Sequence, residues 1–241
     1  MKHNLYSILS VLLLLVVWYA YALFIDNVFI LPKPTQVFIE LFDLLRNIST
    51  YTIILSSFQR LFIAITIAST LGIIFGLLAG GYRRIAAFLH PLVTTLRSLP
   101  VASIIVILLI LSRDRTSAIY TITFLMIFPI IFESTKQGVL NIDTSIKQAL
   151  DLEPHRRIKI LRYIYLPLAF PYIKTGFLQS IGLGFKVLVM AEFIAQTDNS
   201  IGKTLYISST SIYYETVFAW TIIIIVIVLM IERLIKKLRS H

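Results

Sequence analysis

Residues 61–82 read LFIAITIASTLGIIFGLLAGGY, a stretch without a charged side chain. At about 1.5 Å per residue, a helix of this length crosses the roughly 30 Å hydrocarbon layer of a membrane. Five further apolar runs accompany it, at residues 5–25, 85–112, 116–132, 163–191 and 217–231. Lipid offers the backbone no hydrogen-bond partners, and the runs lack the alternation of a β-barrel. The chain is therefore predicted to be an all-α polytopic membrane protein with about six transmembrane helices.

The composition excludes a soluble globular domain. Of the 241 residues, 58% are hydrophobic and 14% are charged, whereas a soluble domain has roughly 25% charged residues. The chain has no cysteine, which excludes disulfides, thiolate metal sites and cysteine nucleophiles. The net charge of +10 does not indicate a nucleic-acid partner, because the basic residues lie between the apolar runs. In that position they orient helices in a lipid bilayer.

The distribution of lysine and arginine predicts that both termini are cytoplasmic. With the N-terminus inside, thirteen basic residues fall in cytoplasmic segments and five in outer segments. Cytoplasmic loops carry the excess of basic residues in membrane proteins. The five outer residues are Lys33, Arg46, Arg113, Arg115 and Lys203.

The chain is predicted to form one transmembrane domain over residues 1–241. Its core covers residues 53–241, while residues 1–52 supply the first span and an outer amphipathic helix capped by Thr35. The sequence Ala20-Tyr21-Ala22 leaves open a cleaved signal peptide. The apolar run continues through Ile25, which favours a retained span.

Two stripes of small residues predict close helix packing. Small side chains at every fourth position let helix backbones approach each other. Packing within the chain is the main interpretation, and a contact between subunits is the alternative. The stripes are Ala68, Gly72, Gly76 and Gly80 in one run and Gly176, Ser180 and Gly184 in another.

Several charged residues fall within or beside the apolar runs, where charge is costly and usually faces protein or water. Arg60 and Lys174 are near predicted ends and are interpreted as structural residues that reach the surface. Lys186 and Glu192 are six positions apart, too far for a helical pair, so each needs its own partner or a wet face. Glu192, Lys186 and Arg97 are the candidate residues of a translocation path or gate. For Glu192, a structural hydrogen-bonding role is an equal alternative.

Catalytic patterns are absent from the sequence. The four histidines have no metal-ligand spacing, and no glycine loop, nucleophile elbow or pair of buried carboxylates is present. We therefore do not expect an enzyme.

The loop between the fourth and fifth runs is predicted to contain two short helices. Asp143 or Thr144 can cap the first, Pro154 interrupts the chain, and residues 156–164 can form a second, basic and amphipathic helix. Such a helix can lie on the membrane surface or dock into a partner protein. The residues alone leave both alternatives open.

Several short matches, in order and spacing, run along residues 30–240. They are Leu31-Pro32-Lys33-Pro34, Ser57-Phe58-Gln59-Arg60, Leu96-Arg97-Ser98-Leu99-Pro100, Ile164-Tyr165-Leu166-Pro167 and Ala191-Glu192. With these matches the sequence resembles the inner-membrane permease subunits of binding-protein-dependent ABC importers, in the nitrate, sulfonate and taurine branch. The resemblance implies the permease fold of type I ABC importers, with a cytoplasmic coupling region at residues 143–162.

The family's cytoplasmic motif, E-A-A followed by G and I-x-L-P, identifies the segment that docks onto the ATPase. Counting back from Ile164 places Gln148-Ala149-Leu150 on E-A-A and Pro154 on the glycine, so only Ala149 is retained there. The implied docking residues are Gln148, Ala149, Leu150, Pro154, Arg156, Arg157, Ile158 and Arg162.

The resemblance also implies the partners. They are ABC ATPase subunits, a second permease copy, in a homodimer, and an extracytoplasmic substrate-binding protein, all at a bacterial inner membrane. ATP and Mg²⁺ would sit on the partner ATPase, and this chain would bind no cofactor. The substrate would be a small solute such as a sulfonate, nitrate, taurine or a vitamin precursor. The alternative is a membrane scaffold or assembly subunit that transports nothing.

Overall fold

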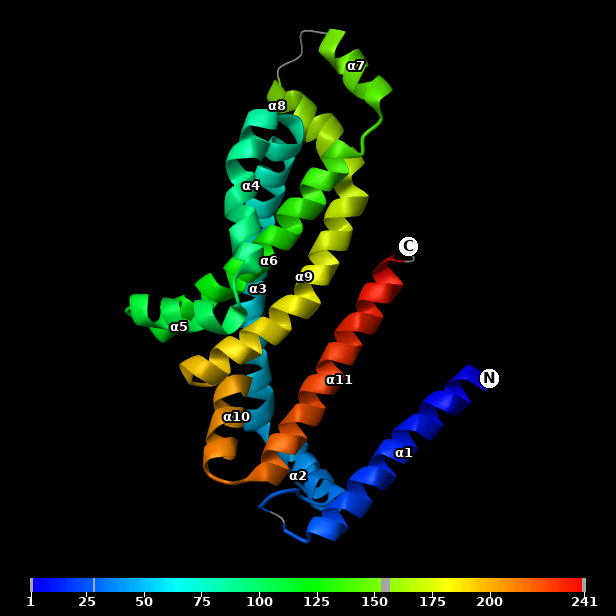
Figure 1. Ribbon diagram of the computed structural model, residues 1–241, viewed down its shortest axis with the longest axis vertical. Helices are drawn as coiled ribbons and strands as arrows, with labels where there is room; N and C mark the ends of the chain where they lie inside the picture. The colour runs from blue at the N-terminus through cyan, green and yellow to red at the C-terminus, as the bar shows by residue number, and fades with distance from the viewer. Residues whose placement is uncertain (1, 28, 153–156, 240–241) are drawn as a thin grey trace.

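The computed structural model describes residues 2–27, 29–152 and 157–239, and every regular element within these ranges is helical (Figure 1). This confirms the all-α prediction. The α-helices up to the coupling region are α1 (Lys2–Ile25), α2 (Pro34–Arg46), α3 (Ile48–Gly81), α4 (Arg83–Ser98), α5 (Val101–Leu111), α6 (Arg115–Leu140) and α7 (Thr144–Leu152). They are followed by α8 (Arg157–Ile160), the π-helix η1 (Leu161–Tyr165), α9 (Leu166–Ala195), α10 (Ile201–Thr210) and α11 (Tyr214–Arg239).

Helices α3, α6 and α9 form the centre of the bundle, and small residues set their spacing. A Cβ added to Gly76 would lie 2.6 Å from Thr135, and one added to Gly80 would lie 2.5 Å from Val139. On α9, a Cβ at Gly176 would lie 2.5 Å from Ser134 of α6. Both stripes of small residues therefore pack within the chain, as the main interpretation predicted.

The third apolar run, residues 85–112, is broken rather than straight. Helices α4 and α5 meet at Leu99 and Pro100 and are bent by 102°. Proline has no N–H to donate and disfavours helical geometry in the residue before it. Accordingly, Leu99 is extended, with φ −74° and ψ 133°.

Four helices are long and apolar enough to cross a membrane: α3, α6, α9 with its preceding turn, and α11. The bent pair α4 and α5 makes a fifth if it acts as one span. The described apolar part of α1, Leu12–Ile25, is shorter than a full span. The count of six spans therefore stays a prediction.

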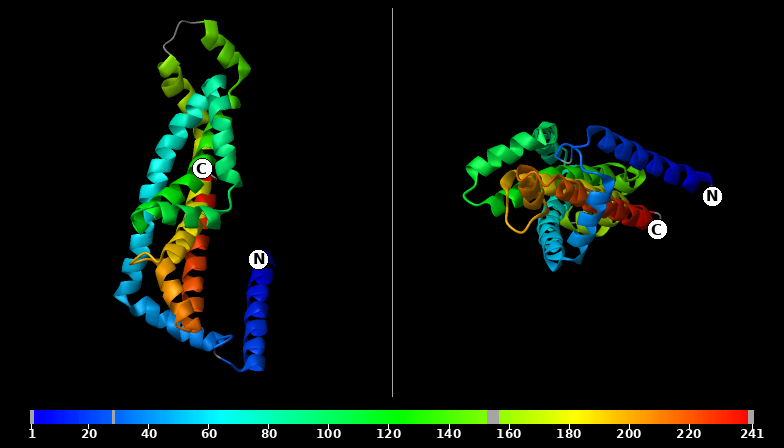
Figure 2. Two further views of the ribbon diagram at one scale, coloured as in Figure 1. Left: turned by 60° about the vertical axis from the view of Figure 1, so that its left-hand side comes forward. Right: turned by 90° about the horizontal axis from the view of Figure 1, so that it is seen from below.

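In Figure 1, α7 lies at the top of the molecule and α2 and α10 lie toward the bottom, while α1 and α11 each run from the bottom toward the right. Helix α5 projects to the left at mid-height. Helix α1 stands apart from the bundle in Figure 2, and its Trp18 ring stacks on Phe218 of α11 at 5.4 Å. The orientation of the termini in the membrane stays a prediction.

The outer segment before α3 is shorter than predicted. Helix α2 begins at Pro34 with Lys33 as N-cap, because proline is pre-set for the first helical turn. The Lys33 N–H donates to Oε1 of Gln36 at 3.0 Å, so the prediction of Thr35 as cap was wrong. Helix α3 begins at Ile48, well before the uncharged run, with Asn47 accepting the Ser49 N–H at 3.0 Å.

Candidate functional site

The predicted coupling helix is present as α7, at the far end of the molecule in Figure 1. Oδ1 of Asp143 accepts the N–H of Ser145 at 2.8 Å and its hydroxyl at 2.9 Å, as a helix cap does. These hydrogen bonds, the one from the backbone N–H first, lower the pKa of Asp143 below its ordinary value. Gln148 and Ala149 are exposed on this helix, where a partner can reach them.

A π-helical turn joins the coupling region to α9 without a break. The Leu166 N–H donates to the Leu161 carbonyl five residues back, and Pro167 next in sequence has no N–H to donate. A Cβ added to Gly81 would lie 3.2 Å from Leu161 and 3.4 Å from Tyr165. The turn therefore lies directly against the end of α3.

At the opposite side of the molecule, Glu192 of α9 is completely buried, with 0% exposure. Its carboxylate accepts the Ser57 hydroxyl at 2.9 Å and pairs with the Arg60 guanidinium at 3.0 Å. The Gly202 N–H, in the first turn of α10, donates to the same carboxylate at 3.4 Å. One buried acid therefore ties together α3, α9 and α10.

Arg60 extends this network to the loop between α9 and α10. Its Nη1 and Nη2 also donate to the carbonyls of Asn199 at 3.1 Å and Asp198 at 2.8 Å. Asn199 is left-handed, with φ 48°, and a Cβ on Gly202 would collide with the backbone of Phe193. We call Ser57, Arg60, Glu192 and the loop at residues 196–200 the outer clasp. It fixes the sharp reversal of the chain at the end of α9.

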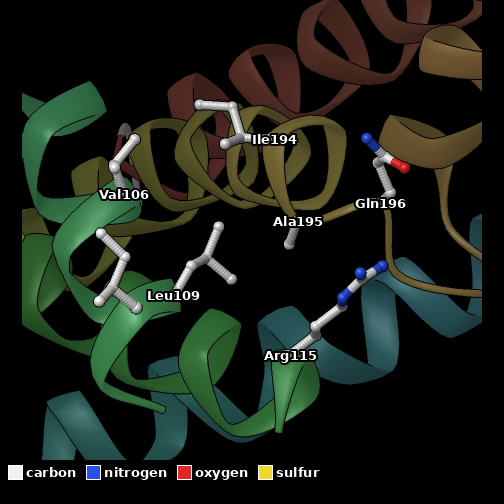
Figure 3. A pocket seen from close by; sticks show the side chains of 7 residues that line it. Val106, Leu109, Arg115, Ile194, Ala195 and Gln196 are labelled. Atoms are coloured by element: carbon white, nitrogen blue, oxygen red, sulfur yellow. The ribbon is translucent and has the colours of Figure 1, made fainter. Parts of the chain in front are cut away.

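A cavity of about 350 Å³ opens beside the outer clasp, between α5, the start of α6 and the end of α9. Figure 3 shows apolar side chains such as Val106 and Leu109 on one side and Arg115 with Gln196 on the other. The nearby acids are engaged elsewhere. Asp114 accepts the Ser117 N–H at 2.8 Å, and Asp198 pairs with Lys203. Accordingly the pKa values of both aspartates are lowered, mainly by those hydrogen bonds.

A second hollow, of about 380 Å³, lies between α4, α6 and α9. Its polar lining consists of Arg97, Glu133, Ser134 and Gln179. Glu133 pairs with Lys136 at 3.4 Å, whereas Arg97 has neither a hydrogen bond nor an ion pair among the described residues. We call this space the central hollow.

The sequence of residues 68–240 matches the family described as binding-protein-dependent transport system inner membrane component. The chain belongs to this family. The match begins within α3 and includes the coupling region, the central hollow and Glu192. Family membership confirms both the membrane location and the predicted resemblance.

The chain is similar to transport permeases of several organisms. It is 27% identical to the bicarbonate transport system permease protein of Synechococcus elongatus. The match covers 77% of this chain and 66% of the relative, so the chain spans just under two thirds of that relative's length. It is 26% identical to the taurine transport system permease protein of Escherichia coli, covering 98% of this chain and 87% of the relative. A putative aliphatic sulfonates transport permease protein of Bacillus subtilis is 24% identical, covering 88% and 79%. These relatives are transport permeases rather than enzymes.

The predicted docking residues differ in exposure, and some of them lie outside the described residues. In the permease, Gln148 and Ala149 are exposed, Leu150 is half-buried and Arg162 is exposed. Pro154 and Arg156 lie outside the described residues, as do the side chains of Arg157 and Ile158. The predicted separate helix at residues 156–164 is wrong in one respect, because the helix from Arg157 continues through the π-turn into α9.

The structure separates the three predicted path residues. Glu192 belongs to the outer clasp, Arg97 lines the central hollow, and Lys186 is exposed on α9 between them. The interpretation of Arg60 as a residue that reaches the surface was incomplete, because it is the ion-pair partner of Glu192. A signal for this pair was present in the sequence. A lone acid in a span needs a cation, and Arg60 lies near the outer end of another span.

Proposed function

We propose that this permease forms the translocation path of an ABC importer for a small solute and couples it to ATP hydrolysis on a separate ATPase. Family membership supports this function, and so do the relatives, which are named for bicarbonate, taurine and aliphatic sulfonates. One observation carries the proposal. Arg97 and Lys186 lie in apolar runs of the sequence, are exposed, and have no partner among the described residues.

These two cations indicate that the face that bears them does not meet lipid. A charge at membrane depth costs several kcal/mol in hydrocarbon and usually faces protein or water. Gln179, Leu183 and Lys186 follow each other at the four- and three-residue spacing of one helical face, and all are exposed. We propose that a second copy of the permease covers this face, so that the homodimer encloses a wet path between the two α9 helices.

The coupling region fits an ATPase contact. Helix α7 projects beyond the bundle in Figure 1, and it carries the exposed Ala149. The helix that resumes at Arg157 continues directly into α9 and packs on α3 through the π-turn. A push on this region would therefore move α9 and α3 together, as a bistable rearrangement between two packings requires. ATP and Mg²⁺ belong to the partner ATPase in this proposal, and this chain supplies no ligand to them.

The opposite side of the molecule would receive the substrate-binding protein. We propose that this side is extracytoplasmic, that both termini are cytoplasmic, and that the membrane is the bacterial inner membrane. The basis is the excess of basic residues on the side of the termini and α7. The outer side instead carries balanced pairs, such as Asp198 with Lys203 and Asp26 with Lys33.

Replacing Ala149 by glutamate tests the coupling. If α7 docks in a cleft of an ATPase, the new carboxylate is buried without a partner, at a cost of a few kcal/mol. Ala149→Glu should abolish co-purification of an ATPase from native membranes, while membrane insertion stays normal. The matched control is Ser145→Glu, at the exposed start of the same helix, which should retain the ATPase. A wild-type permease that never captures an ATPase would favour the scaffold alternative.

If Ala149→Glu keeps the ATPase while changes at Ile158 and Arg162 lose it, the docking register is wrong. If neither change matters, the region lies on the membrane surface and the coupling proposal fails.

A further inference from the structure

The central hollow contains more hydrogen-bond donors than acceptors. Arg97 brings a guanidinium with five N–H groups, Gln179 brings an amide and Ser134 a hydroxyl. Glu133 is the single acid of the lining, and its charge is balanced by Lys136 at 3.4 Å. The side chains of this ion pair are 23% and 12% exposed, respectively. The hollow therefore carries a net charge of about +1, from Arg97.

We propose that the central hollow binds a small oxyanion in transit, with Arg97 as the principal ligand and Ser134 and Gln179 as additional donors. This inference deepens the proposed function and rests on it, because the same face of α9 lines the proposed path. A guanidinium matches the two oxygens of a carboxylate, sulfonate or bicarbonate group with parallel hydrogen bonds. The substrate class is therefore anionic, with an oxygen-rich head group.

The remaining lining gives the hollow room for an organic substituent. Pro129, Ile130 and Leu183 form its apolar wall, and its volume of about 380 Å³ falls in the range of small-molecule sites. The position of Ser134 is fixed by the contact between α6 and α9. A Cβ on Gly176 would lie 2.5 Å from the Ser134 hydroxyl oxygen. The donor therefore sits at a close contact between the two helices.

Lys186 provides a second positive charge on the way to this site. It lies on the same face of α9 as Gln179, about 10 Å nearer the outer end for the seven-residue spacing of a helix. Arg60, in contrast, is occupied by Glu192 and two loop carbonyls. Lys186 on α9 and Arg97 on α4 therefore place two positive charges along the proposed path, which favours the entry of anions and opposes that of cations.

Binding of methanesulfonate to the full chain in zwitterionic nanodiscs, measured by calorimetry, tests the proposal. Dimethyl sulfone, which is nearly the same shape and neutral, is the control ligand. We expect methanesulfonate to bind and dimethyl sulfone not to bind at the same concentration. Arg97→Gln should weaken binding by about tenfold or more, as the loss of a charged hydrogen-bonding partner does. Arg46→Gln, the same change at an exposed arginine of α2, should leave the affinity unchanged.

Glu133→Gln provides a result that misfolding does not mimic. It removes the single negative charge from the lining, so methanesulfonate should bind several-fold more tightly. Weaker or unchanged binding in Glu133→Gln, equal affinities of Arg97→Gln and the wild type, or no binding to the wild type would overturn the proposal. Capture of an ATPase by the wild-type chain is scored in parallel. If the ATPase is captured and methanesulfonate does not bind, the anion site fails and the importer function stands. If no ATPase is captured, the importer function itself fails.

Discussion

Removing Arg60 should destabilise the permease more than neutralising its partner Glu192. The two side chains form one ion pair, but their surroundings differ. Glu192 is 0% exposed, and Arg60 is its only cation among the residues that the structure describes. The Arg60 side chain is 12% exposed and keeps two backbone carbonyls. Arg60→Ala leaves a buried carboxylate with only the Ser57 hydroxyl and the Gly202 N–H. Glu192→Gln leaves a guanidinium that still has two acceptors.

The expected magnitudes follow from this asymmetry. Breaking a buried ion pair so that one charge stays uncompensated costs about 3–5 kcal/mol, which is the expectation for Arg60→Ala. Glu192→Gln keeps the shape and loses charge-assisted hydrogen bonds, at about 1.5–3 kcal/mol. The double variant Arg60→Ala/Glu192→Gln should be less damaging than the sum of its parts, because no carboxylate remains to be stranded.

Thermal unfolding of the purified variants in detergent measures which substitution lowers the stability more. For a chain of this size each kcal/mol lowers Tm by about 2–4 °C, so Arg60→Ala should lose roughly 6–20 °C and Glu192→Gln about half of that. Arg46→Ala, at an exposed arginine of α2, is the control and should stay close to the wild type. A loss for Arg60→Ala no larger than for Glu192→Gln, or additive losses in the double variant, would refute the reasoning.

Three other predictions concern the fold, the topology and a helix cap. Gly202→Ala should prevent stable packing of α10, because the added Cβ would meet the Phe193 backbone. The control Gly182→Ala, with nothing within 4 Å of the added Cβ, should leave Tm unchanged or higher. Equal Tm values for the two variants would contradict this packing. The chain has no cysteine of its own, so single introduced cysteines can be labelled specifically. Cysteines at Lys33 and Lys203 should react with a membrane-impermeant thiol reagent from outside, and one at Arg157 only from inside. Labelling of position 157 from outside would contradict the topology. The Asp143 carboxyl should titrate below its ordinary pKa of 3.8 in an NMR titration, because the Ser145 N–H and hydroxyl favour its charged form. Its contribution to the start of α7 is therefore present above that value and lost as the pH falls through the lowered pKa, and Ser145→Ala should move the midpoint back up.

Patterns that depend on local spacing were predictable from the sequence. The uncharged runs identified the long helices, and the four-residue spacing of Gly72, Gly76 and Gly80 identified a packing stripe. Asp143 and Thr144 were the alternative caps at the start of α7, and the structure shows Asp143 in that role. The apolar runs and the helix cap depend on neighbours within a few residues, so the sequence contains their cause. The spacing of the glycines identifies the packing face, although the helix that covers it, α6, is distant in sequence. The order and spacing of short matches likewise pointed to the family that residues 68–240 confirm.

Features that depend on contacts distant in sequence were not predictable. The partner of Glu192 is Arg60, 132 positions away, and the sequence offered only a charge in need of a partner. The central hollow combines residues of α4, α6 and α9, and only Arg97 among its polar residues was a candidate. The 102° bend between α4 and α5 was also not predicted. A proline marks where a helix breaks, but the packing of α5 on its neighbours sets the angle.

The most direct test of the central claim is the environment of Lys186 in the assembled transporter. A single cysteine at Lys186 in membrane vesicles that contain the permease with its partners would be treated with a water-soluble, membrane-impermeant thiol reagent and with a lipid-soluble one. If the exposed face of α9 lines a wet path, the water-soluble reagent should react, and the rate should change when ATP and vanadate trap the ATPase. A cysteine at Leu14, 69% exposed in the apolar part of α1, Leu12–Ile25, should react with the lipid-soluble reagent alone. Reaction of position 186 with the lipid-soluble reagent alone, at a rate indifferent to ATP, would contradict a translocation path on this face.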